Sequence, residues 1–395
     1  MRRIALYSHD TLGLGHLRRC LKLAAHLSAR LGELSGLLVT GSPWHPLFPL
    51  PRGFRVAALP PVAKTADGRY ESRAAGVDLA TVIAIRRREI AAALEGFRPD
   101  LLVVDNVPCG LHGEVLPALR ALRRRGARTV LALRDVLDDP AAICREWARA
   151  GACEAVASLF DEVWVFGDHD DAAALTAGGP LAGVAAKVHS CGRIGTPAPS
   201  PGLAPPDPPD AAGQSRPSPP LVLVTGGGGQ DAAPLMSAYL RAVHAFRPPV
   251  DSQLVLGPDF PRRERATLPP AGETRARVRV AGFVPDLPGR MARSNVIVGM
   301  AGYNTVCEIL ASGRPAVLVP RVAPRQEQLL RARRWARSGR VRLVDPRALT
   351  PRALWEAVDE LLELPAPGRA ELSGGRVAAR RAASLLAVPA REAVG

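Results

Sequence analysis

Residues 278–328 read VRVAGFVPDLPGRMARSNVIVGMAGYNTVCEILASGRPAVLVPRVAPRQEQ. The stretch alternates short apolar runs with glycine-marked turns and one run of helical spacing. In chain order the pattern predicts a strand, helical turns, a buried strand, a tight turn, a helix and a strand: residues 278–281, 287–293, 295–300, 301–304, 305–311 and 316–320. Strand, turn, helix and strand in this order indicate a βαβ unit of a parallel sheet.

The turn over residues 301–304 carries the chemistry of this unit. A turn from a buried strand into a helix directs N–H groups and the positive end of the helix dipole outward, where a phosphate is the usual guest. Gly302 allows close backbone approach. Glu308, one turn later, is within reach of a neighbouring ribose diol. The alternative is a capping box, in which Thr305 and Glu308 only close the helix start, and the spacing leaves both readings open.

The blocks GFVPDL, AGYNTVCE, GRPAVLVP and EQ follow one another in order within this stretch. This order resembles the C-terminal donor-binding domain of MurG-like glycosyltransferases and, more broadly, the GT-B nucleotide-sugar transferases. The resemblance implies an α/β protein of GT-B fold, with two Rossmann-like parallel-sheet domains facing a central cleft. It also implies a nucleotide-sugar donor, with the base on the backbone of Phe283 and Val284 and the ribose on Glu308. The diphosphate would lie at the helix start, formed by Gly302, Tyr303, Asn304 and Thr305.

Length and composition agree with this class of protein. The 395 residues suffice for two domains, and 47% hydrophobic residues indicate a folded globular chain. No apolar run reaches the roughly 20 residues needed to cross a bilayer. The N-terminal residues before the first motif are too few for a signal peptide. We therefore expect a cytoplasmic protein, with weak peripheral contact at the inner face of the membrane as the open alternative.

The net charge of +15 suggests a nucleic-acid partner at first sight. However, the basic residues are spread along the chain, and only 4% of residues are aromatic, which disfavours a surface for stacking bases. We expect no nucleic-acid partner; an anionic diphosphate donor or membrane surface fits the charge. The six cysteines form no C-x-x-C pair, which argues against a zinc site or a disulfide framework.

The N-terminal segment repeats the strand, glycine turn and helix pattern. Residues 3–8 predict a strand, 9–16 a glycine-bearing loop and 17–31 a helix. The loop has no third glycine in the right place, so it is not an NAD-type site. The run GLGHLRRC resembles the first loop of MurG-like transferases and of PseG-type nucleotide-sugar hydrolases, which both place a histidine there. The resemblance makes His16 the catalytic candidate, beside Gly13 and Gly15; a histidine that merely packs the loop is the alternative.

Further polar residues follow predicted strands of the first half. Asp105 ends a strand over residues 100–105, and Arg134 and Asp135 follow a strand over 129–133, so the topology places them at the cleft as acceptor contacts. The arginine triplet 86–88 is predicted to be a solvated helix face. Asp168 and Asp170 imitate a metal-binding DxD motif. Because the chain otherwise has GT-B organisation, we expect transfer without a metal or cofactor.

The chain divides at a proline-rich segment. Residues 1–195 form the predicted acceptor-side domain, 196–220 an extended linker with ten prolines, and 221–395 the nucleotide-sugar-binding domain, whose last helix is expected to pack back on the first domain. Four glycines, residues 226–229, follow a strand over 221–225 and suit a turn that cradles phosphate. The resemblance assigns Gly227, Gly228, Gly229, Glu327 and Gln328 to donor binding; Glu327 and Gln328 could instead be ordinary first-turn helix residues.

Three functions follow from these observations. The first is an inverting, hexosyltransferase-type glycosyltransferase, with a UDP-sugar as the favoured donor and His16 as general base on an acceptor hydroxyl. The second is a nucleotide-sugar hydrolase, with water in place of the acceptor. The third is a non-catalytic protein that binds an anionic ligand. The acceptor is open; a lipid-linked or a small molecule fits equally.

Overall fold

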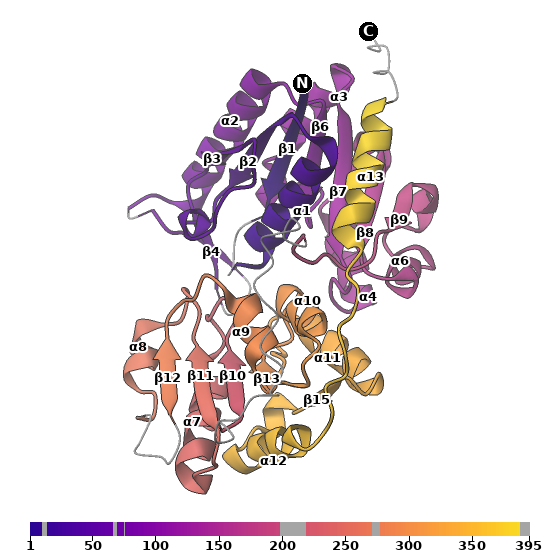
Figure 1. Ribbon diagram of the computed structural model, residues 1–395. Helices are drawn as coiled ribbons and strands as arrows, with labels where there is room; N and C mark the ends of the chain where they lie inside the picture. Colours follow the sequence, from indigo (N-terminus) through magenta and orange to yellow (C-terminus); the bar gives the residue numbers. More distant parts are fainter. Residues whose placement is uncertain (10–13, 66–68, 75, 198–218, 271–276, 388–395) are drawn as a thin grey trace. The chain divides into compact units, whose positions relative to one another are not determined.

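The computed structural model describes residues 1–9, 14–65, 69–74, 76–197, 219–270 and 277–387. The chain divides into two compact units, Met1–Pro197 with Leu372–Gly395, and Ala198–Glu371. Each unit is built on one parallel sheet with helices packed on it (Figure 1). The predicted α/β class with two parallel sheets is therefore confirmed. Gly13 and most of the proline-rich segment lie outside the described residues.

The first unit contains a seven-stranded sheet in the order β3-β2-β1-β6-β7-β8-β9, in which all neighbouring pairs are parallel. These strands are β1 (Arg2–Ser8), β2 (Leu34–Thr40), β3 (Phe54–Ala58), β6 (Leu101–Asp105), β7 (Arg128–Arg134), β8 (Glu162–Phe166) and β9 (Val188–Ser190). A separate antiparallel hairpin pairs β4 (Val62–Lys64) with β5 (Tyr70–Ser72). The central strands are buried throughout, which explains their continuous apolar runs.

The helices of the first unit cover this sheet and include the C-terminal one. They are α1 (Gly15–Leu31), α2 (Leu79–Phe97), α3 (Leu116–Arg124), α4 (Pro140–Arg149), α5 (Ala152–Leu159), α6 (His169–Thr176) and α13 (Gly374–Ala387), with short 3₁₀ turns η1 (His45–Leu47), η2 (Leu111–Gly113) and η3 (Ala182–Lys187). Helix α13 packs beside α1. Its Arg381 also donates two hydrogen bonds, at 2.7 and 2.8 Å, to the Glu162 carboxylate.

The second unit contains a six-stranded parallel sheet in the order β12-β11-β10-β13-β14-β15. Its strands are β10 (Leu221–Thr225), β11 (Asp251–Val255), β12 (Val278–Ala281), β13 (Val296–Gly299), β14 (Ala316–Leu318) and β15 (Val341–Leu343). Its helices are α7 (Ala233–Phe246), α8 (Arg262–Ala266), α9 (Leu287–Arg293), α10 (Tyr303–Ser312), α11 (Glu327–Arg337) and α12 (Pro351–Leu362), with a 3₁₀ turn η4 (Pro346–Ala348). The βαβ unit predicted from residues 278–328 is thus present.

Both sheets reverse their winding direction next to their first strand. In the first unit the chain runs outward from β1 to β3 and then returns to the other side of β1 with β6. In the second unit it runs from β10 to β12 and returns beside β10 with β13. Ligands of open α/β sheets bind at such switch points, outside the carboxyl ends of the strands. The candidate sites are therefore the ends of β1 and β6, and of β10 and β13.

Arg86 corrects one sequence prediction. Arg87 and Arg88 are exposed as a solvated face requires, but Arg86 is fully buried. Its guanidinium donates to both oxygens of Glu114, at 2.6 and 2.7 Å, and to the carbonyl of Pro60 at 2.8 Å. The Tyr7 hydroxyl donates to Glu114 at 2.6 Å, and burial raises the pKa of Tyr7 well above its usual value. A charged triplet in sequence cannot show which member turns inward.

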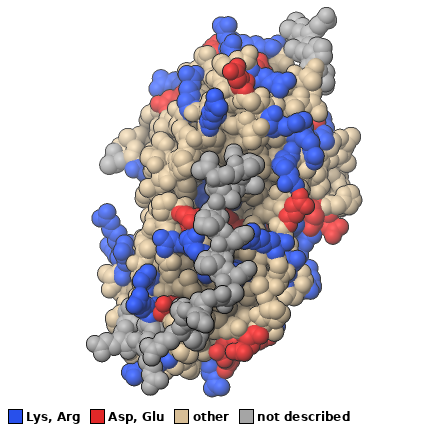
Figure 2. Space-filling view, viewed as in Figure 1, with Lys and Arg blue, Asp and Glu red and all other residues tan. Residues whose placement is uncertain are grey.

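Among the described residues, none of the helices is long and apolar enough to cross a membrane. On the face seen in Figure 2, Lys and Arg side chains are spread over the surface, with Asp and Glu side chains between them.

Candidate functional site

His16 and Asp105 meet at the switch point of the first unit. Asp105 ends β6, and His16 is the second residue of α1, the helix that comes after β1. His16 Nδ1 lies 2.5 Å from Asp105 Oδ2. Arg19, one turn further along α1, donates from Nε to the other carboxylate oxygen at 2.7 Å. An Nδ1–H that donates to Asp105 leaves Nε2 as the ring nitrogen that can take a proton.

The electrostatics of this group favour an ionised Asp105. Asp105 and Arg19 are only 2% and 3% exposed. Burial by itself would raise the pKa of Asp105, but the charges of Arg19 and His16 outweigh it and hold that pKa below its usual value. The carboxylate therefore stays anionic and orients the imidazole of His16, whose side chain is 17% exposed. An imidazole oriented by a carboxylate is the arrangement of a general base.

The sequence identified His16 and Asp105 separately but not their contact. Asp105 was predicted as an acceptor contact, and in the structure its carboxylate is hydrogen-bonded to Nδ1 of His16. Arg19 was missed; its only signal was its position three residues after His16, on the same helix face. Gly15 is the exposed first residue of α1, with open space around it. His9 also contacts His16, with ring centroids 5.6 Å apart in an edge-to-face arrangement.

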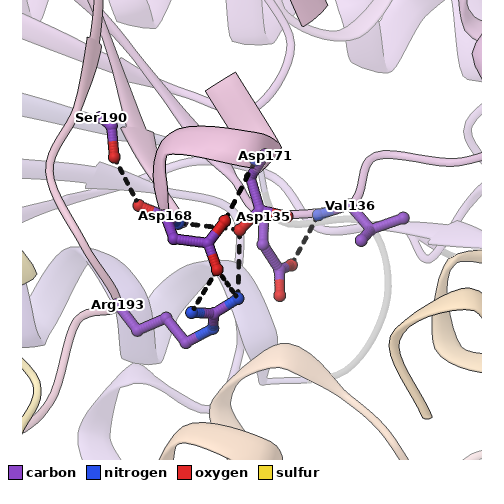
Figure 3. A network of polar contacts seen from close by, with 7 residues as sticks. Asp135, Val136, Asp168, Asp171, Ser190 and Arg193 are labelled. Carbon is purple, nitrogen blue, oxygen red and sulfur yellow. Dashed lines mark hydrogen bonds and ion pairs between the residues drawn. The ribbon is translucent and has the colours of Figure 1, made fainter. Parts of the chain in front are cut away.

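The other predicted acceptor contacts, Arg134 and Asp135, lie at the end of β7. Arg134 donates to the carbonyl of Leu137 at 3.2 Å, and the buried Asp135 accepts from the backbone N–H of Val136 at 2.7 Å. Figure 3 shows Asp135 close to Asp168 and Arg193. The structure brings these groups to the same edge of the sheet as His16, because all come after parallel strands of one sheet.

The DxD interpretation is not supported at Asp168. This residue caps α6: its carboxylate accepts from the Asp171 N–H at 3.2 Å, and the Asp171 carboxylate accepts from the Asp168 N–H at 2.8 Å. Arg193 binds both carboxylates, at 3.3 and 3.1 Å (Figure 3). The pair of aspartates that matters structurally is therefore 168 and 171, as a capping box, while Asp170 is exposed.

In the four-glycine turn of the second unit, the backbone packs tightly around Gly226 and Gly229 and leaves more space at Gly227. A Cβ on Gly226 or Gly229 would lie 2.5 or 2.7 Å from the carbonyl oxygen of Leu256, so the protein itself requires glycine there. At Gly227, where φ is +62°, the nearest atom to a Cβ would be Thr305 Oγ1, 3.5 Å away. The turn therefore lies against the start of α10, as the predicted diphosphate site requires.

Gly228 and a glycine that the sequence reading missed complete this turn. The Gly228 carbonyl accepts from the Asp259 N–H at 2.8 Å. Gly257 comes after β11 with φ +100°, and a Cβ there would meet the backbone of Gly227 and Gly228. Its signal in the sequence was a glycine directly after the apolar run of residues 254–256, which is a place of close backbone approach.

Helix α10 begins at Tyr303, with Gly302 as its N-cap residue. Thr305 is thus the third residue inside the helix and cannot be the N-cap, so the capping-box alternative is wrong. Tyr303, Asn304 and Thr305 form the buried first turn. The first N–H groups of a helix lack intrahelical acceptors, which suits this start to an anion. Glu308 lies in the following turn and is 5% exposed.

Helix α11 contacts this helix start through one buried arginine. Arg331 of α11 is buried, donates to the carbonyl of Ala301 at 2.9 Å and lies 5.8 Å from the ring centroid of Tyr303. The sequence reading missed it, although it lies one helical turn after Glu327. Phe283 and Val284 directly follow β12 and Gly282; Phe283 is half-buried, and Val284 is buried in the hydrophobic cluster that also contains Val306 of α10.

Glu327 and Gln328 open α11, as predicted, but both contact Arg321. Glu327 is 1% exposed and accepts from Arg321 Nη2 at 2.7 Å. The Gln328 side-chain oxygen accepts from the Arg321 N–H at 3.3 Å. Arg321, missed by the sequence reading, also pairs with Asp231 beyond the glycine turn, at 3.1 Å. Of the two residues assigned to donor binding, Glu327 is thus paired with the Arg321 guanidinium, and Gln328 is hydrogen-bonded to the Arg321 backbone.

Comparison with solved structures defines the class of fold. A UDP-glucosyltransferase from Polygonum tinctorium superposes with a TM-score of 0.61 at 16% identity, covering 98% of this chain and 99% of that one. MurG of Acinetobacter baumannii superposes with a TM-score of 0.56 at 14% identity, covering 100% and 97%. The chain therefore has the GT-B fold.

Sequence comparison then narrows the relationship within that fold. Residues 221–374 match the model of the glycosyltransferase family 28 C-terminal domain. The UDP-N-acetylglucosamine–N-acetylmuramyl-(pentapeptide) pyrophosphoryl-undecaprenol N-acetylglucosamine transferase of Rhodospirillum centenum is 36% identical over 152 residues, which are 37% of this chain and 39% of that protein. The curated relatives are thus matched over less than half of their length. The predicted resemblance to MurG-like GT-B glycosyltransferases is confirmed.

Proposed function

We propose that this protein is an inverting glycosyltransferase that moves a sugar from a UDP-sugar to an acceptor hydroxyl. The observation that carries this proposal is the hydrogen bond between His16 and the buried, ionised Asp105 at the switch point of the first unit. A histidine held in this way serves as a general base. The structures that share the fold of this chain include the UDP-glucosyltransferase named above, which supports sugar transfer from a UDP-sugar.

The second unit supplies the donor half of the proposal. The uracil would lie on the backbone of Phe283 and Val284, the ribose diol on Glu308, and the diphosphate between Gly227 and the α10 start. The Cβ position of Gly227 and the Thr305 hydroxyl are 3.5 Å apart, so these two elements line one place. Amide groups and the helix dipole would stabilise the negative charge that develops on the departing diphosphate.

The reaction follows from these roles. His16 Nε2 would take the proton of the acceptor hydroxyl while the oxygen attacks the anomeric carbon. UDP would leave from the opposite face, which inverts the configuration at that carbon. Asp105 would stabilise the imidazolium that forms. We propose that no metal is needed, since α10 and the glycine turn take over the stabilisation of the diphosphate; activity that persists in excess EDTA is the corresponding test.

For the acceptor we propose a chemical class, a lipid-linked molecule. The Rhodospirillum centenum relative is named for transfer to a pyrophosphoryl-undecaprenol acceptor. A lipid-linked acceptor would bring this protein to the cytoplasmic face of a membrane as a peripheral enzyme. Sedimentation with vesicles that carry a polyprenyl diphosphate sugar, compared with plain vesicles, tests this part separately.

The proposal is tested by ligand binding and by product analysis. Titration calorimetry with UDP, dTDP, GDP and ADP should show selective binding of UDP, and UDP-sugars should raise the unfolding midpoint. Incubation of UDP-sugar with and without acceptors should yield transfer product only when an acceptor is present. Free sugar released at the full rate without acceptor would show a hydrolase and overturn the transferase assignment.

A further inference from the structure

Arg321 occupies a defined place at the carboxyl edge of the second sheet. It comes after β14 and contacts residues from two other segments. Nη2 pairs with Glu327 of α11 at 2.7 Å, and Nη1 pairs with Asp231, which lies beyond the glycine turn after β10, at 3.1 Å. The Glu327 partner is 1% exposed, whereas the Asp231 side chain is 40% exposed.

The sheet order determines which segments the pair of Arg321 with Asp231 joins. β14 and β10 are not neighbours, because β13 lies between them. Neighbouring strands are about 4.8 Å apart, so the two strand ends are separated by about 10 Å. Arg321 follows β14 and Asp231 follows β10, so their pair joins the segments on the two sides of the end of β13. That end leads directly into Gly302 and α10, the proposed diphosphate site.

The direction of the bound nucleotide would bring its terminal phosphate toward Arg321. The proposed base contacts, Phe283 and Val284, come after β12, and the diphosphate contacts come after β13. A nucleotide laid along the sheet order from β12 to β13 points its outermost phosphate toward β14. Arg321 follows β14 and extends from that side to Asp231.

The contacts of Arg321 suit an exchange of partners. The guanidinium keeps a buried Nε–H that donates to none of the described residues. The pair with Asp231 is partly exposed, and such pairs contribute little to stability. Paired hydrogen bonds from arginine to phosphate are stronger and geometrically specific. The buried partner, Glu327, holds the guanidinium in position in either case.

We propose that Arg321 binds the terminal phosphate of the donor nucleotide. The guanidinium would give up its pair with Asp231 for a pair with that phosphate and would stay paired with Glu327. Asp231 is then a competitor for the guanidinium in the empty site. This inference rests on the proposed function, because it takes the nucleotide diphosphate to lie at the α10 start.

The test is calorimetric binding of UMP and UDP to wild-type and variant protein. Arg321→Met should weaken UDP binding about 10- to 100-fold, the loss of a charge-assisted pair, and change UMP binding less than about 3-fold. Asp231→Asn should strengthen UDP binding and leave UMP binding unchanged. Arg342→Met is the matched control, since Arg342 of β15 forms a similar exposed pair with Glu360; it should alter neither.

Two further comparisons keep the outcomes separate. Arg321→Met removes one charge partner of the buried Glu327 carboxylate, so the double variant Arg321→Met/Glu327→Gln removes that charge as well and should show the same selective loss of UDP. If Arg321→Met lost affinity equally for UMP and UDP, or for neither, the role of Arg321 would be overturned. UDP binding by the wild-type protein would still uphold the proposed function. Wild-type protein that binds neither nucleotide would overturn both.

Discussion

His16 Nδ1 lies 2.5 Å from Asp105 Oδ2, although 89 residues separate them in the chain. The contact exists because β1 and β6 are adjacent strands of a parallel sheet, so the start of α1, just beyond β1, lies beside the carboxyl end of β6. Arg19 holds the second oxygen of the same carboxylate. The Asp105 carboxylate therefore holds the imidazole of His16 in one orientation.

Loss of this contact should slow transfer without weakening donor binding. Asp105→Asn removes the acceptor that selects the tautomer of His16, and turnover should fall on the order of 10³- to 10⁴-fold, as should that of His16→Ala. Steady-state kinetics measures the turnover, and calorimetry with UDP measures the donor affinity. Donor affinity that falls in parallel with turnover would place the pair in donor binding and contradict the general-base role.

Removal of the Glu308 carboxylate should weaken binding of the ribose specifically. Glu308→Ala should reduce UDP affinity about 10- to 100-fold, because a charge-assisted hydrogen bond to the ribose diol is lost. The 2′,3′-dideoxy analogue of UDP lacks that diol and should bind wild-type and variant protein equally. If the variant weakens both ligands by the same factor, Glu308 acts on the fold of α10 and not on the ribose.

Disruption of the buried Arg86–Glu114 pair should be among the most destabilising single changes in the first unit. Both side chains are fully buried, and Arg86→Met leaves an uncompensated carboxylate, at a cost of about 3–5 kcal/mol of unfolding free energy. The double variant Arg86→Met/Glu114→Leu removes the stranded charge and should recover much of that loss. Chemical denaturation measures both; a double variant as unstable as the single one would argue against the charge as the cause.

The packing of α13 on α1 should depend on the absence of a side chain at Gly375. A Cβ there would overlap the imidazole of His26, which is 7% exposed and lies 3.0 Å from the carbonyl of Gly195 through Nε2. Gly375→Ala should cost about 1–3 kcal/mol through overpacking. Gly96→Ala is the control: it lies in α2 with open space around it and should stabilise by up to about 1 kcal/mol. Thermal unfolding of the two variants, compared with the wild type, measures both changes in stability.

His26 should make stability depend on pH below neutrality. Burial lowers its pKa, and the charge of Arg376 acts in the same direction, against the hydrogen bond to Gly195. Because the folded pKa is below the unfolded one, the stabilisation is complete above the unfolded value of about 6.5 and is lost as pH falls toward the folded pKa. Unfolding free energies at pH 7.5, 6 and 5 should fall more steeply for wild type than for His26→Gln. Parallel curves would assign the pH dependence to other groups.

Much of the second unit could be predicted from its sequence. The strand at Val278–Ala281 and the helix at Leu287–Arg293 have the predicted bounds, because local apolar runs and turn residues define them. Helix α10 begins two residues earlier than predicted, at Tyr303, since Gly302 serves as its N-cap. The turn between β13 and α10 was identified because glycine spacing is a local property of the chain.

Local sequence patterns specified the order of strands and helices and the glycine turn after β10, because these depend on residues close together in the chain. Which polar groups meet depended on tertiary packing. It buried Arg86 out of a charged triplet, paired Arg193 with Asp168 and Asp171, and joined Arg321 to Asp231 and Glu327. Such pairings depend on which strands become neighbours in a sheet, and long-range burial, not local spacing, sets that arrangement.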